Sequence, residues 1–292
     1  MNEFLRTDTA MSALSSMRTG GIAPVAYFPE TEQSLCDTVR RLTEEHKRFF
    51  VFGNLSNVLL PDGTLDFVPV ITTGIKTVTV TDTDDGIKVY AACGVSLTGL
   101  ALEFCRRDYA GLSFAYGIPG TVGGAVFMNA GAYGSEMKNI VRSVRFYDID
   151  ADTVCEIPAA DCSFGYRTSV FAHKNGVILG ASLSLAACES GKALAEAKEF
   201  MERRREKQPL EYPSCGSAFK RPEGYFAGEL IEKCGLKGYA VGGACVSEKH
   251  AGFVVNKGGA TSADVEKLLC DVRAKVHQTF GVELEPEIRI IK

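Results

Sequence analysis

Residues able to bind an anion or move a proton occur at several places in the second half of the chain. The first is F-G-Y-R-T-S, residues 164–169, where Tyr166 and Arg167 lie in a glycine-containing turn before a strand-like segment. A guanidinium carries N–H donors in a fixed planar fork that matches carboxylate or phosphate. Arg167 is therefore either an ordinary surface arginine or an anion clamp, and its residue type alone leaves both open.

The second place is the basic run R-R-R-E-K-Q, residues 203–208, which closes a charged segment and precedes Pro209. Basic side chains are favoured in the last helical turn because they face the negative end of the helix dipole. Arg204 and Lys207 could serve this structural purpose alone. They could equally hold a diphosphate or a carboxylate.

The third place is S-C-G-S-A-F, residues 214–219, between two prolines. It is not a G-x-S-x-G motif, and no histidine is near in sequence, so a nucleophile elbow is unsupported. Cys215 could be a reactive thiol only if its pKa were lowered, and nothing in the sequence indicates that. Ser217, after a glycine in a constrained loop, could present its hydroxyl as a proton donor.

The fourth place is E-P-E-I-R near the C-terminus, where Glu287 and Arg289 are two residues apart. On a strand, such residues point to the same face. They could form a structural ion pair or project into a common site.

Two glycine-rich stretches could approach a cofactor with bare backbone. Gly117 to Gly134 contains six glycines in 18 residues and almost no charge, and G-N-L-S-N, residues 53–57, follows an apolar strand-like run. Glycine lets another group approach the main chain closely, and successive backbone amides can bind phosphate. There is no G-x-G-x-x-G fingerprint opening a βαβ unit and no P-loop, so a dinucleotide would need another kind of cradle.

Composition excludes several classes of protein. The net charge is −4, with no basic face rich in aromatic residues, so nucleic acid is a poor candidate partner. No apolar run reaches the length of a transmembrane helix, and the N-terminus lacks the apolar core of a signal peptide. The ten cysteines form no C-x-x-C pair and the four histidines are scattered, which favours reduced thiols and no metal site.

Local patterns predict the elements that must position these residues, and their mixture of hairpins and crossovers indicates an α+β fold. A D-D-G turn and the stretch D-I-D-A-D each mark a hairpin. Thr261 with Asp264 resembles a capping pair. Helices are expected over 31–45, 96–106, 192–207, 226–234 and 261–280. Strands are expected over 25–28, 49–52, 68–72, 77–81, 87–92, 141–147, 153–157, 177–185, 240–246, 252–256 and 282–291.

In their joint order and spacing, these motifs resemble the UDP-N-acetylenolpyruvoylglucosamine reductase family, from about Arg18 to Arg289. The resemblance also includes M-R-T-G-G, K-Q-P-L-E-Y-P-S-C-G-S-A-F-K-R-P and K-H-A-G-F-V-V-N. The short connection between Arg167 and Val177 is similar to the family's second type, which lacks an extra tyrosine-bearing loop. That family's first type has asparagine where this chain has Arg221, so contacts there do not transfer.

The resemblance implies an FAD-binding domain of the vanillyl-alcohol-oxidase type in two lobes, residues 1–75 and 76–189. A C-terminal α+β domain, residues 190–292, would bind the UDP-sugar, and the segment 282–291 would return to the active site. FAD would be bound non-covalently. The residues implied for it are Gly53, Asn54, Leu55, Ser56, Asn57, Gly117, Ile118, Pro119, Gly120, Thr121, Gly123, Gly124 and Arg289.

The resemblance also implies a reaction. NADPH reduces the flavin, and the flavin then passes hydride to C3 of UDP-N-acetylglucosamine enolpyruvate, giving UDP-N-acetylmuramate for peptidoglycan. Arg167 and a protonated Glu287 would stabilise the enolate, and Ser217 would protonate C2. Tyr166, Arg204, Lys207 and Gln208 would contact the substrate. The resemblance implies a cytoplasmic bacterial enzyme, and we expect a monomer.

Two other functions are kept open at this point. One is an oxidase of the same flavoprotein class acting on an alcohol or hydroxy acid; several of those tether FAD through histidine, which neither glycine stretch contains. The other is a non-catalytic sensor of uridine nucleotides. The set Arg167, Ser217 and Glu287 argues against a sensor, since mere binding does not require it.

Overall fold

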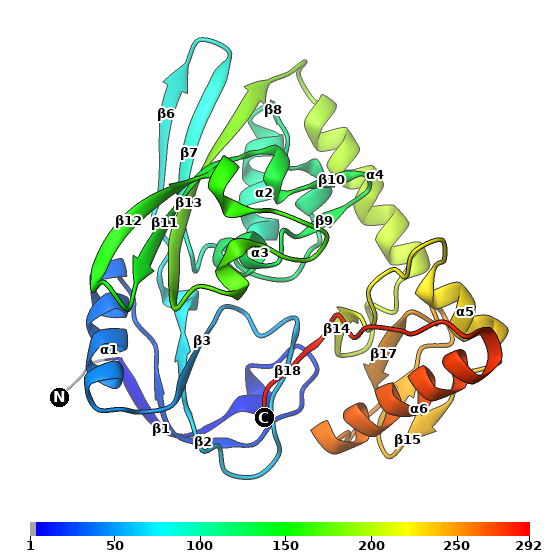
Figure 1. Cartoon of the computed structure of the whole chain (residues 1–292). Helices are drawn as coiled ribbons and strands as arrows, with labels where there is room; N and C mark the ends of the chain where they lie inside the picture. Colours follow the sequence, from blue (N-terminus) through cyan, green and yellow to red (C-terminus); the bar gives the residue numbers. More distant parts are fainter. Residues whose placement is uncertain (1–3) are drawn as a thin grey trace. The chain divides into compact units, whose positions relative to one another are not determined.

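The computed structural model describes residues 4–292 (Figure 1), which form two compact units. The first unit contains residues 4–6, Val25–Asn54 and Phe67–Arg203; the second contains Thr7–Pro24, Leu55–Asp66 and Arg204–Lys292. Each unit has its own hydrophobic core. The division into 1–75, 76–189 and 190–292 stays a prediction.

The first unit is built on an antiparallel sheet in the order β12-β11-β13-β7-β6, with β8 beside β13. Both predicted hairpins, β6–β7 and β11–β12, are confirmed. Helix α3 packs on β13 and β7, and Figure 1 shows α2 and α3 along one side of this sheet. The elements are β6 (Val78–Thr83), β7 (Gly86–Ala92), α2 (Leu97–Arg106), β8 (Tyr109–Ala110), α3 (Val122–Phe127), β9 (Gly131–Ala132), β10 (Ser135–Glu136), β11 (Val141–Asp148), β12 (Thr153–Pro158) and β13 (Gly176–Ala187).

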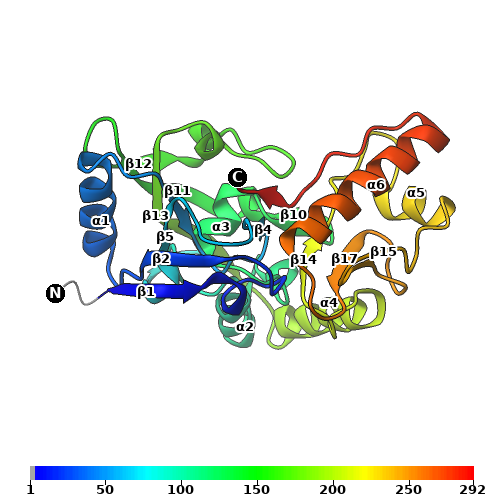
Figure 2. The ribbon, with the colours of Figure 1, turned by 90° about the horizontal axis from the view of Figure 1, so that it is seen from below.

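A second sheet has the order β1-β2-β5-β3, in which β2 and β3 both pair with β5 in parallel. Figure 2 shows β1 and β2 side by side, with α1 nearby. Helix α1 begins where predicted, because the Thr31 hydroxyl accepts a hydrogen bond from the Ser34 amide at 3.0 Å. The elements are β1 (Leu5–Ala10), β2 (Ile22–Tyr27), α1 (Glu32–Glu44), β3 (Phe49–Phe52) and β5 (Val68–Ile71).

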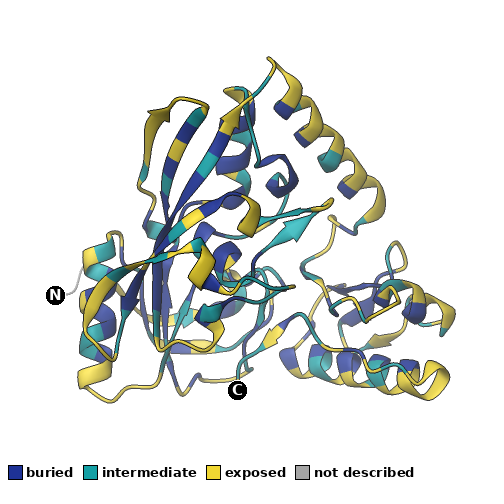
Figure 3. Ribbon diagram, turned by 45° about the horizontal axis from the view of Figure 1, so that its top comes forward, coloured by how far each residue is buried: buried dark blue, intermediate teal, exposed yellow. Residues whose placement is uncertain are grey.

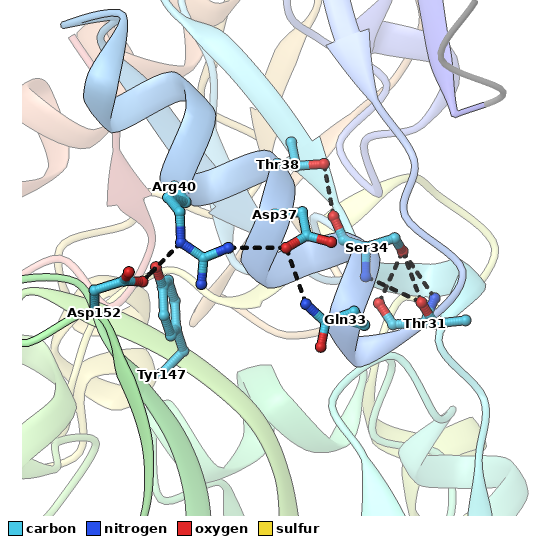
Figure 4. Close-up of polar contacts among 8 residues, drawn as sticks. All are labelled: Thr31, Gln33, Ser34, Asp37, Thr38, Arg40, Tyr147 and Asp152. Atoms are coloured by element: carbon cyan, nitrogen blue, oxygen red, sulfur yellow. Dashed lines mark hydrogen bonds and ion pairs between the residues drawn. The ribbon is translucent and has the colours of Figure 1, made fainter.

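A polar network joins α1 to the β11–β12 hairpin (Figure 4). Arg40 Nε donates to Asp152 Oδ1 at 2.8 Å, and the hydroxyl of Tyr147 donates to the same oxygen at 2.6 Å. Burial and the neighbouring carboxylate raise the pKa of Tyr147 to about 12. The hydrogen bonds from Tyr147 and Arg40 lower the pKa of Asp152. The network thus ties a helix to a sheet through side chains more than 100 residues apart in sequence.

Helix α4 (Lys192–Lys207) has the predicted bounds and is amphipathic only weakly. Figure 3 shows a mostly exposed helix, and its fully buried side chains include the small residues Ala193 and Ala197. The ring of Tyr133 stacks on that of Phe200 with centroids 4.3 Å apart, and the Tyr133 hydroxyl donates to the Phe200 carbonyl at 3.0 Å. The end of the glycine-rich stretch is therefore fixed to this helix.

The second unit contains an antiparallel sheet in the order β14-β17-β16-β15 and two helices. The prediction of a single strand over 240–246 was wrong. The chain turns at Gly242, which has φ 53°, and Gly243, so that two short strands form instead. The strand expected over 282–291 is regular only at β18. The elements are β4 (Val58–Leu59), β14 (Ser214–Ser217), α5 (Ala227–Lys233), β15 (Ala240–Val241), β16 (Ala244–Val246), β17 (Phe253–Asn256), α6 (Ser262–Phe280) and β18 (Arg289–Ile290).

Helix α6 is capped twice at its N-terminus. The predicted Thr261–Asp264 capping box is present. In addition, the Asp62 carboxylate accepts from the amides of Ser262 and Ala263, each at 3.0 Å. A carboxylate is favoured there because it meets unsatisfied N–H groups and the positive end of the helix dipole. Asp62 thereby anchors the 55–66 segment to a helix that begins 200 residues later.

The helices in the described part of the chain include none that is both long and apolar enough to cross a membrane.

Candidate functional site

The two glycine-rich stretches touch in the first unit. Gly53 follows β3, and a Cβ on it would lie only 2.2 Å from Thr121 Oγ1. Thr121 is buried and caps α3, accepting a hydrogen bond from the Gly124 amide at 3.4 Å. A side chain at position 53 would have to displace Thr121, so a glycine at this position lets the two loops pack together here.

The backbone amides of α3 are largely used within the protein. Val122 N–H donates to Val95 and Gly123 N–H to Cys93, both at 2.9 Å. A Cβ on Gly123 would meet the Cys93 Cβ at 2.9 Å, so close packing alone explains that glycine. Gly124 is exposed and has space around it.

Donors for an anion must therefore come mainly from the residues before α3. Gly117 N–H donates to Thr98 Oγ1 at 2.7 Å, and Ile118 N–H to Ala115 at 3.0 Å. Within residues 4–292, the amides of Gly120 and Thr121 have no hydrogen-bond partner. These two adjacent N–H groups lie next to the contact between Gly53 and Thr121. They are better suited to bind a phosphate than the Gly123 N–H, which already donates to Cys93. Pro119, exposed between them and Ile118, has no N–H to offer.

The rest of the G-N-L-S-N loop belongs to the second unit. Leu55 is buried, and its carbonyl accepts from the Ser16 amide at 3.3 Å. Ser56 is partly buried, and Asn54, at the end of the first unit's segment, is exposed. Asn57 is committed to the C-terminal segment: its Nδ2 donates to the Glu287 carbonyl and its own carbonyl accepts from the Arg289 amide, each at 3.0 Å. Asn57 thus holds the main chain of the segment that contains Glu287 and Arg289.

Ser217 lies at the end of β14, where the strand bulges. The pairing with β17 shifts register between Ser214 and Ser217, and Gly216 supplies the left-handed φ of 76° that the bulge requires. The result is an exposed hydroxyl at Ser217 and a buried thiol at Cys215. Burial raises the pKa of Cys215 to about 12, so it remains an unreactive thiol at neutral pH.

Glu287 lies beside Ser217. Its amide donates to the Ala218 carbonyl at 2.9 Å, and the Lys220 amide donates to Glu285 at 2.9 Å on the same pair of segments. Two of the three residues predicted to be catalytic, 70 positions apart in sequence, are therefore neighbours in the second unit. Arg289 follows on β18 with an exposed side chain.

Arg167 lies in the first unit, in a tight turn closed by Gly165 and Thr168. Its φ of 55° is unusual for a residue with a side chain. Its Nη2 donates to the Gly131 carbonyl at 3.0 Å, and its guanidinium lies 5.0 Å from the centre of the Tyr166 ring. The turn thus presents a half-buried cation beside an exposed aromatic ring.

Asn129 supports this turn and was missed by the sequence analysis. It is fully buried; its Nδ2 donates to Gly165 and its Oδ1 accepts from the Lys138 amide, both at 2.9 Å. The hydroxyl of Ser169 donates to Phe127 at 2.7 Å on the other side of the turn. Asn129 adopts φ 44° within the glycine run, a conformation that asparagine tolerates, but its residue type alone indicates only a turn.

The side chains of the basic run at the end of α4 differ in their exposure to solvent. Arg203 is exposed and pairs with Glu199 one helical turn earlier. Arg204 is buried, Lys207 is exposed, and Gln208 is half-buried with its amide donating to Arg204 at 2.8 Å. Lys249 Nζ donates to the Arg205 carbonyl at 2.6 Å, which brings the turn before β17 to this helix end.

Comparisons with known proteins cover the whole chain. A family model described as the C-terminal domain of UDP-N-acetylenolpyruvoylglucosamine reductase matches residues 208–291, and an FAD-binding domain model matches residues 23–156. Enzymes named UDP-N-acetylenolpyruvoylglucosamine reductase from Clostridium beijerinckii and Caldicellulosiruptor bescii are 42% and 43% identical. These alignments cover 98% and 99% of this chain and 92% and 91% of those proteins.

A solved structure extends the similarity to the fold. The crystal structure of UDP-N-acetylenolpyruvylglucosamine reductase (MurB) from Thermus caldophilus matches with a TM-score of 0.81 and 30% identity, covering 99% of this chain and 100% of that one. The predicted α+β class is confirmed, with an FAD-binding domain followed by a C-terminal domain of this reductase family.

Proposed function

The chain belongs to the UDP-N-acetylenolpyruvoylglucosamine reductase family, and we propose that it uses NADPH and FAD to reduce UDP-N-acetylglucosamine enolpyruvate to UDP-N-acetylmuramate. Its full-length similarity to such reductases and its FAD-binding domain support a flavin-dependent reductase. The observation that carries the proposed chemistry is the hydrogen bond from the Glu287 amide to the Ala218 carbonyl, which joins the backbone of Glu287 to the residue that follows the exposed Ser217.

The residues around the glycine loops fit FAD. Gly53 and Thr121 make the close contact that a side chain at position 53 would fill, and the amides of Gly120 and Thr121 remain available for a phosphate. Asn54, Leu55, Ser56, Asn57, Gly117, Ile118, Pro119, Gly123, Gly124 and Arg289 complete the proposed set. When bound, FAD would supply the hydride that NADPH provides to it.

The chain's own contribution is to handle the charge and the proton. Hydride addition at C3 of the enolpyruvyl group leaves negative charge on C2 and the adjacent carboxylate. Arg167 and a protonated Glu287 would donate hydrogen bonds to that enolate, since donors fixed in advance toward developing charge lower a barrier strongly. Ser217 would then give its proton to C2. A serine hydroxyl is a weak acid, which suits protonation of a strongly basic carbon.

Four residues are proposed to bind the substrate. Tyr166 is half-exposed, so its ring is available to the sugar nucleotide. Lys207 is exposed at the end of α4, where a flexible ammonium can meet phosphate or carboxylate. Arg204 is buried and Gln208 is half-buried, and both are proposed to contact phosphate or carboxylate groups of the substrate.

The test is anaerobic turnover by the purified yellow protein. NADPH should bleach the flavin, and UDP-N-acetylglucosamine enolpyruvate should restore its colour with one NADPH consumed per substrate. Flavin that is bleached but not reoxidised by this substrate would contradict the proposed substrate. Flavin that NADPH leaves unchanged would contradict the proposed reductant and favour a pure binder.

A further inference from the structure

A backbone hydrogen bond beyond the bulge in β14 helps to hold Ser217 in place. Ser214 pairs with Val255 and Ser217 with Phe253, so one more residue lies on β14 than on β17 between these pairs. After the bulge, hydrogen bonding to the neighbouring segment resumes where the Ala218 amide donates to the Gly252 carbonyl at 2.8 Å. A bulge leaves the extra residue without ladder partners, so this bond, together with the one from the Glu287 amide to the Ala218 carbonyl, fixes the backbone that carries Ser217 after the bulge.

Gly252 is held in turn by His250. The Gly252 amide donates to His250 Nδ1 at 3.0 Å. The imidazole also packs on this glycine, since a Cβ at position 252 would lie 2.9 Å from His250 Cε1. On its other side the ring meets Phe253 edge-on, with centroids 5.0 Å apart. The imidazole therefore fixes the turn that carries the Gly252 carbonyl, through one hydrogen bond and through its packing on Gly252 and Phe253.

This contact requires a neutral imidazole. Because Nδ1 accepts a hydrogen bond, the ring proton is on Nε2. The half-buried environment lowers the pKa of His250, mainly through loss of hydration. Lys237 and Lys207 also lower it, whereas Glu232 and the main chain of His250 raise it. Protonation would place a hydrogen on Nδ1 opposite the Gly252 N–H, and the two donors would separate.

We propose that His250 is a positioning residue for Ser217: the neutral imidazole holds Gly252, and Gly252 holds the backbone beside the proton donor. This inference rests on the proposed function of Ser217. It predicts that the step using the Ser217 proton slows when His250 becomes charged. Reduction of the flavin by NADPH does not use that proton and stays unchanged.

Two matched variants separate the hydrogen bond from the rest of the side chain. His250→Asn can place an amide oxygen near the position of Nδ1 and does not titrate. His250→Gln extends its amide toward the position of Nε2 and leaves the Gly252 N–H unpaired. Stopped-flow absorbance follows both half-reactions of each FAD-loaded variant between about pH 5.5 and 8, with FAD content and thermal midpoint as checks on folding.

At neutral pH we expect reoxidation of the flavin by the enolpyruvyl substrate to fall about 10- to 100-fold in His250→Gln and to stay near the wild-type rate in His250→Asn. The rate of flavin reoxidation should fall in the wild-type protein as the pH is lowered, and it should fall much less in His250→Asn. The inference would be overturned if His250→Gln reoxidised its flavin at the wild-type rate, or if both half-reactions slowed equally in that variant. It would also be overturned if the reoxidation rate of His250→Asn fell toward acid pH as steeply as that of wild type. A wild-type protein that never reduces the enolpyruvyl substrate would instead overturn the proposed function.

Discussion

The amide of Glu287 donates a hydrogen bond to the carbonyl of Ala218 at 2.9 Å, and this bond joins the C-terminal segment to the strand that ends at Ser217. The Glu287 carbonyl is fixed as well, since it accepts from Asn57 Nδ2 at 3.0 Å. With both main-chain groups held, the Glu287 side chain projects from a defined point. The main chain of Glu287 is thus held against Ala218, the residue that follows Ser217.

Substitutions at Glu287 test whether its role is to donate a hydrogen bond. Glu287→Gln retains an N–H donor of similar length, whereas Glu287→Ala removes it. We expect Glu287→Ala to slow flavin reoxidation by the enolpyruvyl substrate roughly 10²- to 10³-fold, the scale for losing one oxyanion donor. Glu287→Gln should lose less. Rapid-mixing kinetics will decide: a Gln variant slower than the Ala variant would show that the negative carboxylate matters instead.

Gly53→Ala tests the contact between the two loops. The new methyl group would overlap Thr121 Oγ1, and overpacking of this kind costs about 1–3 kcal/mol. We expect a lower thermal midpoint and less FAD retained on purification. Thr121→Ala in the same chain removes the overlapping atoms, so the double variant should lose less than the sum of the two single variants. Additive losses would mean that the two positions are not in contact.

Asp62 tests the second cap of α6. Asp62→Ala removes both acceptors of the Ser262 and Ala263 amides, and Asp62→Asn keeps one oxygen without the charge. We expect Ala to lower the free energy of unfolding by about 0.5–2 kcal/mol, and Asn by less. Equilibrium urea unfolding measures both. Equal stability of wild type and Asp62→Ala would show that the Thr261 box alone suffices.

Asp152 makes stability depend on pH. Hydrogen bonds from Tyr147 and Arg40 lower its pKa in the folded protein, so the unfolded chain binds a proton more readily. The contribution is therefore present above the ordinary carboxyl pKa of about 4 and is lost as the pH falls through the lowered value. The thermal midpoint of Asp152→Asn should lie below wild type at pH 6 and approach it near pH 3. An Asp84→Asn variant, in the exposed β6–β7 turn, serves as the control.

The helices outside the glycine-rich stretch could be predicted closely because their signals are local, whereas α3, within that stretch, was not predicted. Thr31, Ser96 and Thr261 each cap the helix that the apolar stripe indicates, and α4 ends at Lys207 before Pro209 as expected. Residues 240–246 were harder, because apolar residues flank Gly242 on both sides and hide the turn. A glycine pair inside an apparent strand was the signal that should have divided it.

The supports of the site could not be predicted from local patterns. Asn57 contacts Glu287 across 230 positions, and Asn129 contacts Gly165 across 36. Their hydrogen bonds exist only after the chain has folded, and asparagine in a glycine-rich loop otherwise indicates merely a turn. The residues proposed to do chemistry were recognisable by type. Those that position them became visible only through their contacts.

The central claim is that Ser217 gives the proton to C2, and stopped-flow measurement of the two half-reactions of Ser217→Ala tests it most directly. Reoxidation of the flavin by the enolpyruvyl substrate should slow roughly 10²- to 10⁴-fold, equivalent to about 3–5 kcal/mol, while flavin reduction by NADPH keeps the wild-type rate. If both half-reactions slow equally, or if reoxidation keeps its wild-type rate, Ser217 is not the proton donor.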